Sequence, residues 1–169
     1  MSNSYFLFNI HYLSHPTPIF NWLFLGSFKN AFDNEELSNV GITHVLNCAM
    51  EIHDDNLPKN INYLHIKIVD TVKFDILSYI DIANKFIEEA RKFKNGKILI
   101  HCKFGISRSA AILIGYLMKY YGYTLKNAVD FIKNKRKKIN PNQGFMEQLN
   151  NLEKKLKIKN DLSSESTND

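Results

Sequence analysis

Hydrophobic and polar positions alternate along the chain in segments that predict strands and helices in turn. Four apolar segments have the length and composition of strands, over 19–27, 42–47, 62–69 and 97–100. The third alternates strictly, with Leu64 and every second residue to Ile68 aliphatic and the intervening positions polar or aromatic. Such alternation is typical of a strand with one buried face.

Between and after these strands, apolar residues recur at helical spacing. The first helix is expected to begin at Asp75, which can serve as an N-cap, and to stop at Gly96. Further helices are predicted over 108–121, over 125–138 behind a Thr124 cap, and from Pro141 to Lys157.

Strand, crossover helix and strand in this order predict an α/β fold, with a central mostly parallel sheet flanked by helices. The 169 residues fit one such domain, expected over 19–157, with an aromatic N-terminal extension over 1–18 and a polar C-terminal tail over 158–169. The tail is expected to be frayed from Asn160 onward, because it lacks apolar periodicity. The extension carries Tyr5, Phe6, Phe8 and Tyr12 and is expected to pack on the domain.

The composition says more about the cellular environment of the protein than about its function. The chain has 22 Lys and Arg against 17 Asp and Glu, a formal net charge of +5, which fits an anionic substrate and an ordinary solvated surface equally well. Two cysteines cannot form a disulfide framework, and no His/Cys spacing predicts zinc, so a reducing intracellular setting is expected. No apolar run approaches the length of a membrane span.

The segment 101–109, "HCKFGISRS", carries the most specific chemical signal. It joins a predicted strand to a predicted helix, and Gly105 gives the loop between them the freedom to curl. Successive backbone N–H groups at a helix start bind anions, and Arg108 adds a planar fork that matches tetrahedral oxyanions. The same environment favours a thiolate, so Cys102 is the candidate nucleophile.

A nucleophile of this kind needs an acid to protonate the leaving oxygen. Asp70 follows the third strand and is expected at the same edge of the sheet, with Asp75 as the alternative. Ser109 can hydrogen-bond Cys102, and His101 is expected to hold the loop without acting as acid or base. Arg108 and the loop amides neutralise a phosphoryl group, so neither a metal ion nor another cofactor is required.

A cysteine after a strand is ordinarily a buried small hydrophobe, and an arginine an exposed helix residue. However, H-C-x5-R-S with an internal glycine should arise by chance on the order of once in ten million start positions, given ordinary residue usage. The sequence "HCKFGISRS" therefore resembles the HCxxGxSRS signature of the small, atypical dual-specificity phosphatases of the cysteine-based tyrosine phosphatase superfamily. The likeness continues through "WLFLGS", "GITHVLNCA", "VDTVKFDILSYIDIANKFI" and "INPNQGF", over about 19–156.

This resemblance implies a catalytic domain over 19–157 that hydrolyses phosphotyrosine and phosphoserine or phosphothreonine through a cysteinyl-phosphate. It implies Cys102 as nucleophile, Arg108 as phosphate binder and Asp70 as general acid. A phosphate loop is implied over 103–108, made of Lys103, Phe104, Gly105, Ile106, Ser107 and Arg108. The implied partners are phosphorylated proteins. No nucleic acid and no membrane insertion are expected, the expected location is intracellular, in the cytoplasm with the nucleus as an alternative, and the oligomeric state stays open.

Several alternatives stay open at this point. The substrate could be a phosphoinositide, a glucan or an RNA 5′ end, or the domain could bind phosphopeptides without turnover. Cys48 is either a buried strand residue, the favoured interpretation, or a redox partner for Cys102. The basic run 133–138, "KNKRKK", is interpreted as a solvated helix end in preference to a nuclear signal or a docking patch for acidic substrates.

Overall fold

The computed structural model describes residues 15–53 and 56–165, and it places a five-stranded sheet at the centre of the chain. The strand order is β1-β2-β5-β3-β4. The strands are β1 (Thr17–Pro18), β2 (Leu23–Ser27), β3 (His44–Asn47), β4 (Asn62–His65) and β5 (Ile98–Cys102). All neighbouring pairs are parallel except β1 with β2. The predicted α/β fold with a mostly parallel sheet is confirmed.

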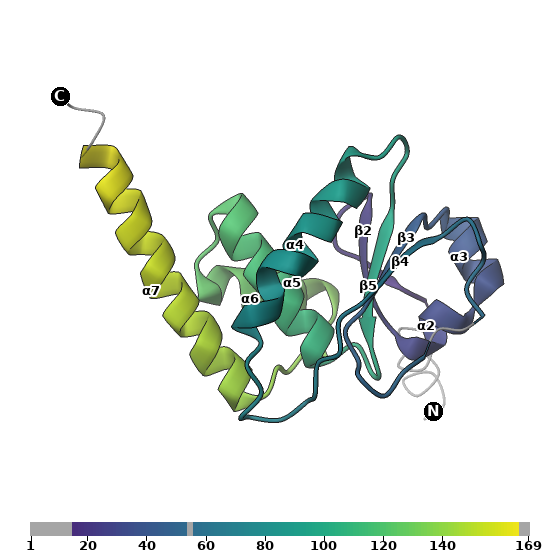
Figure 1. Ribbon diagram of the computed structural model, residues 1–169, viewed down its shortest axis with the longest axis horizontal. Coiled ribbons are helices and arrows are strands. Elements are labelled where there is room, and N and C mark those ends of the chain that lie inside the picture. Colours follow the sequence, from purple (N-terminus) through teal and green to yellow (C-terminus); the bar gives the residue numbers. More distant parts are fainter. Residues whose placement is uncertain (1–14, 54–55, 166–169) are drawn as a thin grey trace, which may run out of the picture.

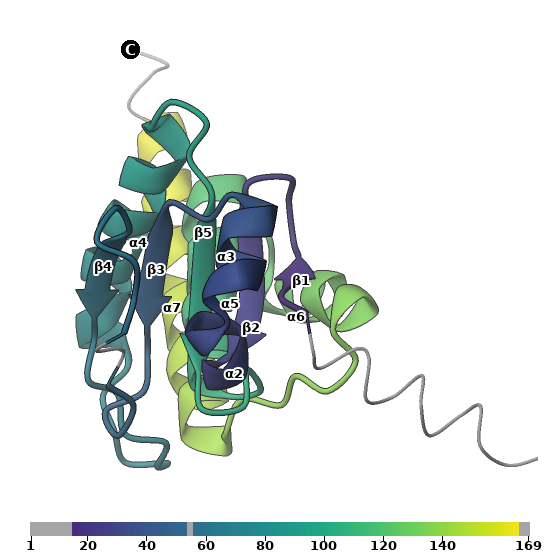
Figure 2. The same ribbon diagram turned by 90° about the vertical axis from the view of Figure 1, so that its right-hand side faces the viewer.

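Helices cover both faces of this sheet (Figures 1 and 2). Two short helices, α2 (Phe28–Phe32) and α3 (Asn34–Val40), lie on one face. The other face carries α4 (Leu77–Lys92), α5 (Arg108–Tyr121), α6 (Leu125–Lys135) and α7 (Gln143–Glu165). Among the described residues, no helix combines the length and apolar character that crossing a membrane requires.

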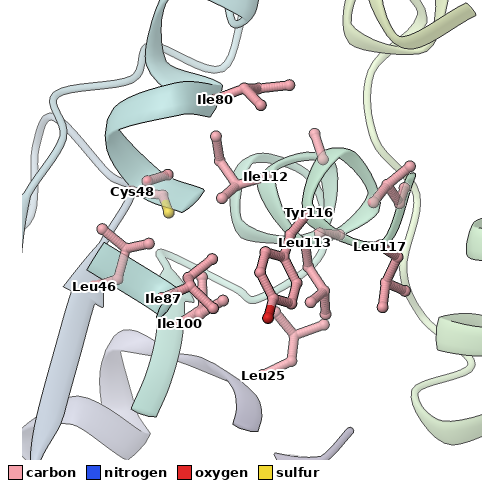
Figure 3. Packing of buried hydrophobic residues seen from close by; sticks show 14 of the residues in the cluster. Leu25, Leu46, Cys48, Ile80, Ile87, Ile100, Ile112, Leu113, Tyr116 and Leu117 are labelled. Carbon is pink, nitrogen blue, oxygen red and sulfur yellow. The ribbon is translucent and has the colours of Figure 1, made fainter. Parts of the chain in front are cut away.

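The core forms because successive residues of a strand point to opposite faces of the sheet. In the central strand β5, Ile98 and Ile100 enter the large cluster beneath α4 and α5, whereas Leu99 enters a smaller one beneath α2 and α3. Helix α5 is buried over nearly its whole length, from Arg108 to Met118, and its aliphatic side chains pack on the sheet (Figure 3). This packing fixes the start of α5 at the carboxyl end of β5.

Several predicted boundaries are wrong. Pairing in the third strand ends at His65 and not at Val69, because the chain then turns to bring Ile68 O to the backbone N–H of Met50. The first long helix ends at Lys92, before Gly96, because Phe93 adopts an extended backbone. Gly96 instead closes the turn that follows, its N–H bonding to Phe93 O at 2.8 Å.

The other differences concern the chain ends and the basic run. The first predicted strand begins at Leu23 and not at residue 19, because residues 19–22 turn between β1 and β2. Helix α6 ends at Lys135, and the next residue, Arg136, is 2% exposed, so the basic run is not uniformly solvated. Helix α7 continues to Glu165, whereas fraying was expected from Asn160. Four aromatic residues of the extension, Tyr5, Phe6, Phe8 and Tyr12, lie outside the described residues.

Candidate active site

The loop over 102–108 curls around the sulfur of Cys102. Two donors point at this sulfur: the backbone N–H of Gly105 at 3.3 Å and the hydroxyl of Ser109 at 3.2 Å. Cys102 is 2% exposed and is the last residue of the central strand. Hydrogen bonds from an amide and a hydroxyl stabilise a negatively charged sulfur more than a neutral thiol.

Gly105 allows this curl, since its φ is +66° and its neighbours leave no space for a side chain. A Cβ at this position would lie 2.3 Å from Gly26 O, a backbone atom of the adjacent strand β2. The loop therefore packs directly on the sheet at Gly105, and the N–H of this residue is directed toward the Cys102 sulfur.

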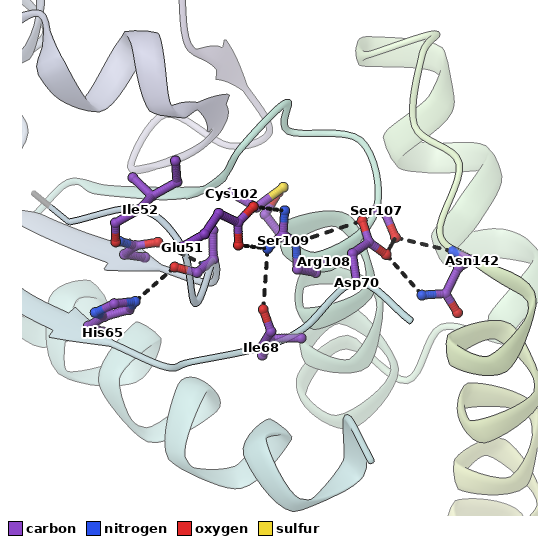
Figure 4. A network of polar contacts seen from close by, with 12 residues as sticks. Glu51, Ile52, His65, Ile68, Asp70, Cys102, Ser107, Arg108, Ser109 and Asn142 are labelled. Atoms are coloured by element: carbon purple, nitrogen blue, oxygen red, sulfur yellow. Dashed lines mark hydrogen bonds and ion pairs between the residues drawn. The ribbon is translucent and has the colours of Figure 1, made fainter. Parts of the chain in front are cut away.

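Arg108, the first residue of α5, is held by a carboxylate that the sequence analysis missed. Its Nη1 and Nη2 atoms donate to Oε2 and Oε1 of Glu51 at 2.6 and 2.8 Å, and Nη1 also donates to Ile68 O at 3.2 Å (Figure 4). The hydrogen bond from Arg108 holds the pKa of Glu51 below its ordinary value. Burial opposes the charge of Arg108, but Glu51 and Cys102 outweigh it and raise the pKa of Arg108.

Glu51 is itself placed by a loop with fixed geometry. Asn47, at the end of β3, donates to Ile52 O at 2.8 Å and accepts from the backbone N–H of Ala49 at 2.8 Å. The ring of His65 bonds to Ala49 O at 2.8 Å (Figure 4). These contacts tie the 47–52 turn to the ends of β3 and β4, so the carboxylate is presented to Arg108 from a rigid segment.

Asp70 lies across the site from Cys102, on the loop that follows β4. Its Oδ1 accepts hydrogen bonds from Ser107 Oγ at 2.7 Å and from Asn142 Nδ2 at 2.9 Å, and its Oδ2 lies 3.7 Å from Arg108 Nε (Figure 4). Asn142 also accepts from the N–H of Phe145 at 3.0 Å, a bond in the first turn of α7. The start of α7 therefore positions the carboxylate.

The alternative acid, Asp75, lies outside the group of residues described above and instead accepts hydrogen bonds at the start of α4. Its Oδ1 accepts from the N–H of Leu77 at 3.1 Å, and its other oxygen accepts a hydrogen bond from the Ser78 hydroxyl. The Ser78 contact lowers the pKa of Asp75. Asp75 thus caps the start of α4, although the helix begins two residues later, at Leu77.

A pocket of about 280 Å³ opens above the Cys102 sulfur. Asp70, Cys102 and Arg108 share it, and the full lining is Asp70, Cys102, Phe104, Ile106, Ser107, Arg108, Asn140 and Asn142. Glu51 does not belong to this lining and contacts Arg108 from outside the pocket. The structure thus brings together the predicted nucleophile, acid and arginine around one small cavity.

The remaining predicted site residues occupy different parts of the loop. His101 is fully buried in β5, and its carbonyl accepts from the N–H of Cys48 at 2.8 Å. Phe104 is 58% exposed at the rim, with Lys103 Nζ 5.4 Å from its ring centre. Ile106 lines the pocket, and its carbonyl accepts from the N–H of Asn140 at 2.9 Å.

Cys48 is a buried free thiol at the end of β3, and Cys102 is also a free thiol. Burial raises the pKa of Cys48 well above its ordinary value, and the proximity of Cys102 raises it further. Both cysteines belong to the same buried hydrophobic cluster. This geometry is compatible with both interpretations of Cys48, as a core residue and as a redox partner.

Sequence reasoning missed two polar residues of this site, and each had a signal. Glu51 follows β3 at the same sheet edge as Asp70 and Cys102, so the rule that placed those two applies to it as well. Asn142 follows Pro141 directly before a helix, where N-cap residues occur. Neither signal specifies a contact partner, because the partners lie 57 and 72 positions away in the chain.

A mostly parallel sheet whose central strand ends in a cysteine beneath a curled loop agrees with the class of cysteine-based phosphatases. The family model for the dual specificity phosphatase catalytic domain matches residues 23–155. The chain belongs to this family.

Individual relatives agree with this assignment. Protein phosphatase Slingshot homolog 2 of Homo sapiens is 42% identical over 137 residues, which are 81% of this chain and 10% of the relative. The crystal structure of human DUSP28 is 30% identical with a TM-score of 0.78, over 84% of this chain and 95% of that one. A human tyrosine phosphatase-like serine/threonine/tyrosine-interacting protein is 31% identical with a TM-score of 0.75, over 83% and 96% of the two chains. The chain spans only 10% to 20% of the length of the Slingshot relatives.

Proposed function

We propose that this chain is a protein phosphatase that hydrolyses phosphotyrosine and phosphoserine or phosphothreonine through a cysteinyl-phosphate intermediate. One observation carries the proposal. The Cys102 sulfur receives hydrogen bonds from Gly105 and Ser109 at the floor of a pocket that Arg108 and Asp70 also line. The pocket holds a nucleophile, a cation for the phosphoryl oxygens and a proton donor within one small volume.

In the first step, the ionised sulfur of Cys102 attacks phosphorus, and the bond between phosphorus and the leaving oxygen breaks. Asp70 gives its proton to that oxygen. The loop amides and Arg108 stabilise the charge on the transferring phosphoryl group.

In the second step, Asp70 takes a proton from water, and the resulting hydroxide oxygen attacks phosphorus. The phosphorus–sulfur bond breaks, inorganic phosphate leaves and Cys102 returns to its ionised form. The Ser109 hydroxyl, 3.2 Å from the sulfur, stabilises this leaving group. The step regenerates the enzyme without any other reactant.

Turnover of phosphopeptides, compared with soluble phosphoinositides, tests the substrate class. We expect the wild-type chain to favour phosphopeptides and Cys102→Ser to lose turnover while retaining binding of inorganic phosphate. A strong preference for phosphoinositides would reassign the substrate. Phosphate binding without any turnover by the wild type would identify a binding module instead.

We further propose phosphorylated proteins as partners and an intracellular, reducing location. Both described cysteines are free thiols, which supports the location. The name of the Slingshot relatives as protein phosphatases supports the substrate class.

A further inference from the structure

A second buried guanidinium lies behind the phosphate loop, outside the sequence motif. Arg136 follows α6 and is 2% exposed, whereas Arg91 of the same chain has a side chain that is 47% exposed. Burying an arginine costs free energy unless its donors are satisfied, so the contacts of Arg136 indicate what its burial achieves.

Each nitrogen of the Arg136 guanidinium reaches an acceptor. Nε donates to Gly105 O at 2.8 Å, Nη2 donates to Phe104 O at 3.2 Å, and Nη1 donates to Thr17 Oγ1 at 2.9 Å. Two of the three acceptors are consecutive carbonyls of the phosphate loop. A peptide unit whose carbonyl is held on one side directs its N–H to the other side, because the unit is planar and trans. The peptide that carries Phe104 O also carries the N–H of Gly105, which points at the Cys102 sulfur.

We propose that Arg136 is a positioning residue that fixes the phosphate loop from behind by holding the carbonyls of Phe104 and Gly105. The amides of the loop are thereby preset toward the sulfur and the phosphate. Thr17 of β1 fixes Arg136 in turn and links the strand at the sheet edge to the loop. The inference deepens the proposed function, on which it rests, by adding a residue that acts through the loop without touching substrate.

The charge of Arg136 adds to this effect. Among the residues whose side chains are described, no carboxylate forms an ion pair with Arg136. Burial lowers the pKa of Arg136, and the nearby Cys102 sulfur opposes that shift, so the cation and an ionised sulfur stabilise each other. Other groups act on the same sulfur: Arg108 as a cation, Asp70 across the pocket, the Cys48 thiol behind it and the Ser109 hydroxyl.

Two substitutions separate geometry from charge. Arg136→Met removes both, and Arg136→Lys keeps the charge but has no planar fork for two carbonyls. Arg91→Met is the matched control, because that arginine lies on α4 and contacts Glu88. The readouts are the dissociation constant of inorganic phosphate from isothermal titration calorimetry, kcat/KM for an aryl phosphate, and the pH dependence of Cys102 alkylation by iodoacetamide, followed by mass spectrometry.

We expect Arg136→Met to lose about 100-fold in kcat/KM, the scale of a small displacement of catalytic groups. Its dissociation constant for inorganic phosphate should rise, and half-maximal alkylation should move up by about one pH unit, as when one nearby cation is removed. Arg136→Lys should weaken phosphate binding without moving the alkylation curve. Arg91→Met should match wild type in all three.

A folded Arg136→Met protein with the wild-type phosphate constant and alkylation curve would overturn the proposal. If that variant does not fold, a wild-type dissociation constant for phosphate in Arg136→Lys would overturn the proposal in the same way. Thr17→Val supplies a second test, because it removes one acceptor of Arg136 and should weaken phosphate binding about two- to fivefold, the scale of a single hydrogen bond. Failure of the proposed function can be distinguished from failure of this inference, because phosphate binding and Cys102 alkylation are both measured without turnover.

Discussion

Replacement of Glu51 by glutamine tests whether this carboxylate positions Arg108 or competes with phosphate for it. The substitution keeps the shape of the side chain, but an amide presents one acceptor oxygen where the carboxylate presents two. Nη2 of Arg108, which donates to Oε1, then loses its charged partner, while Nη1 keeps Ile68 O. Because Arg108 is buried, a guanidinium donor is left poorly paired.

The magnitude follows from the exposure of the two partners. The side chain of Arg108 is 5% exposed, and that of Glu51 is 45% exposed, so solvent screens the pair from one side only. A fully exposed pair contributes about 0–1 kcal/mol, and hydrogen bonds to charged groups contribute roughly 1.5–3 kcal/mol. We therefore expect Glu51→Gln to lower the free energy of unfolding by about 1–2 kcal/mol, roughly 2–8 °C in Tm for a chain of this size.

The same loss should appear in catalysis if Arg108 must be held to bind the phosphoryl group. A transition state destabilised by about 1–2 kcal/mol reacts roughly 5- to 30-fold more slowly. The assay is kcat/KM for an aryl phosphate, together with inhibition by inorganic phosphate. Tighter phosphate binding by Glu51→Gln would refute the reasoning, because it would show that the carboxylate competes with the ligand.

The stability difference should also depend on pH. The pKa of Glu51 is below its ordinary value of 4.5 in the folded chain, so the pair stabilises fully above that value. Its contribution is lost as pH falls through the lowered folded pKa. The difference in Tm between wild type and Glu51→Gln should thus be complete at pH 7 and shrink in acid. A difference that stays constant down to pH values where glutamate is protonated would exclude the ion pair as its cause.

Three further predictions address other parts of the site and core. Asn142→Ala should slow turnover of substrates with poor leaving groups more than turnover of aryl phosphates. Asp70→Asn should have the same effect and should also flatten the alkaline limb of the pH profile of turnover. An unchanged alkaline limb would remove Asp70 from the role of acid. Mild peroxide is expected to leave Cys48 unlinked, in line with its favoured interpretation as a core residue. A Cys48–Cys102 disulfide, formed while peroxide is reduced to water, detected by mass spectrometry and reversed by dithiothreitol, would instead identify Cys48 as a redox partner. Tyr116→Phe should lower stability by about 1–2 kcal/mol in denaturant unfolding, because a buried carboxylate on α4 loses a hydrogen bond of 2.6 Å; no change would show that the carboxylate finds another donor.

The sequence predicted the parts of the molecule that local pattern determines. The strand, loop and helix over 98–121 follow from an apolar run, a glycine and a second apolar period, and each of these signals lies within a few residues. The edge of the sheet where Asp70 and Cys102 meet follows from parallel topology alone. These features required no knowledge of distant contacts.

The remaining features depend on contacts that sequence patterns do not record. Arg136 lies in a run of cations, and nothing in that run distinguishes the residue that turns inward from its solvated neighbours. Glu51 and Asn142 lie in turns without periodicity, and their partners are distant in the chain. Helix α4 ends before Gly96 because Phe93 adopts an extended backbone conformation, and nothing about phenylalanine as a residue type requires this conformation.

The site is assembled from segments that belong to different layers of the molecule. Asn142 directly precedes the last helix, Glu51 lies in a turn after β3, and Cys102 ends the central strand, so a chain in which these segments have not docked holds the nucleophile without its supports. Recovery of the proposed hydrolysis during refolding would therefore require the docking of α7 as well as formation of the sheet, and turnover would measure the fraction of chains in which both are complete.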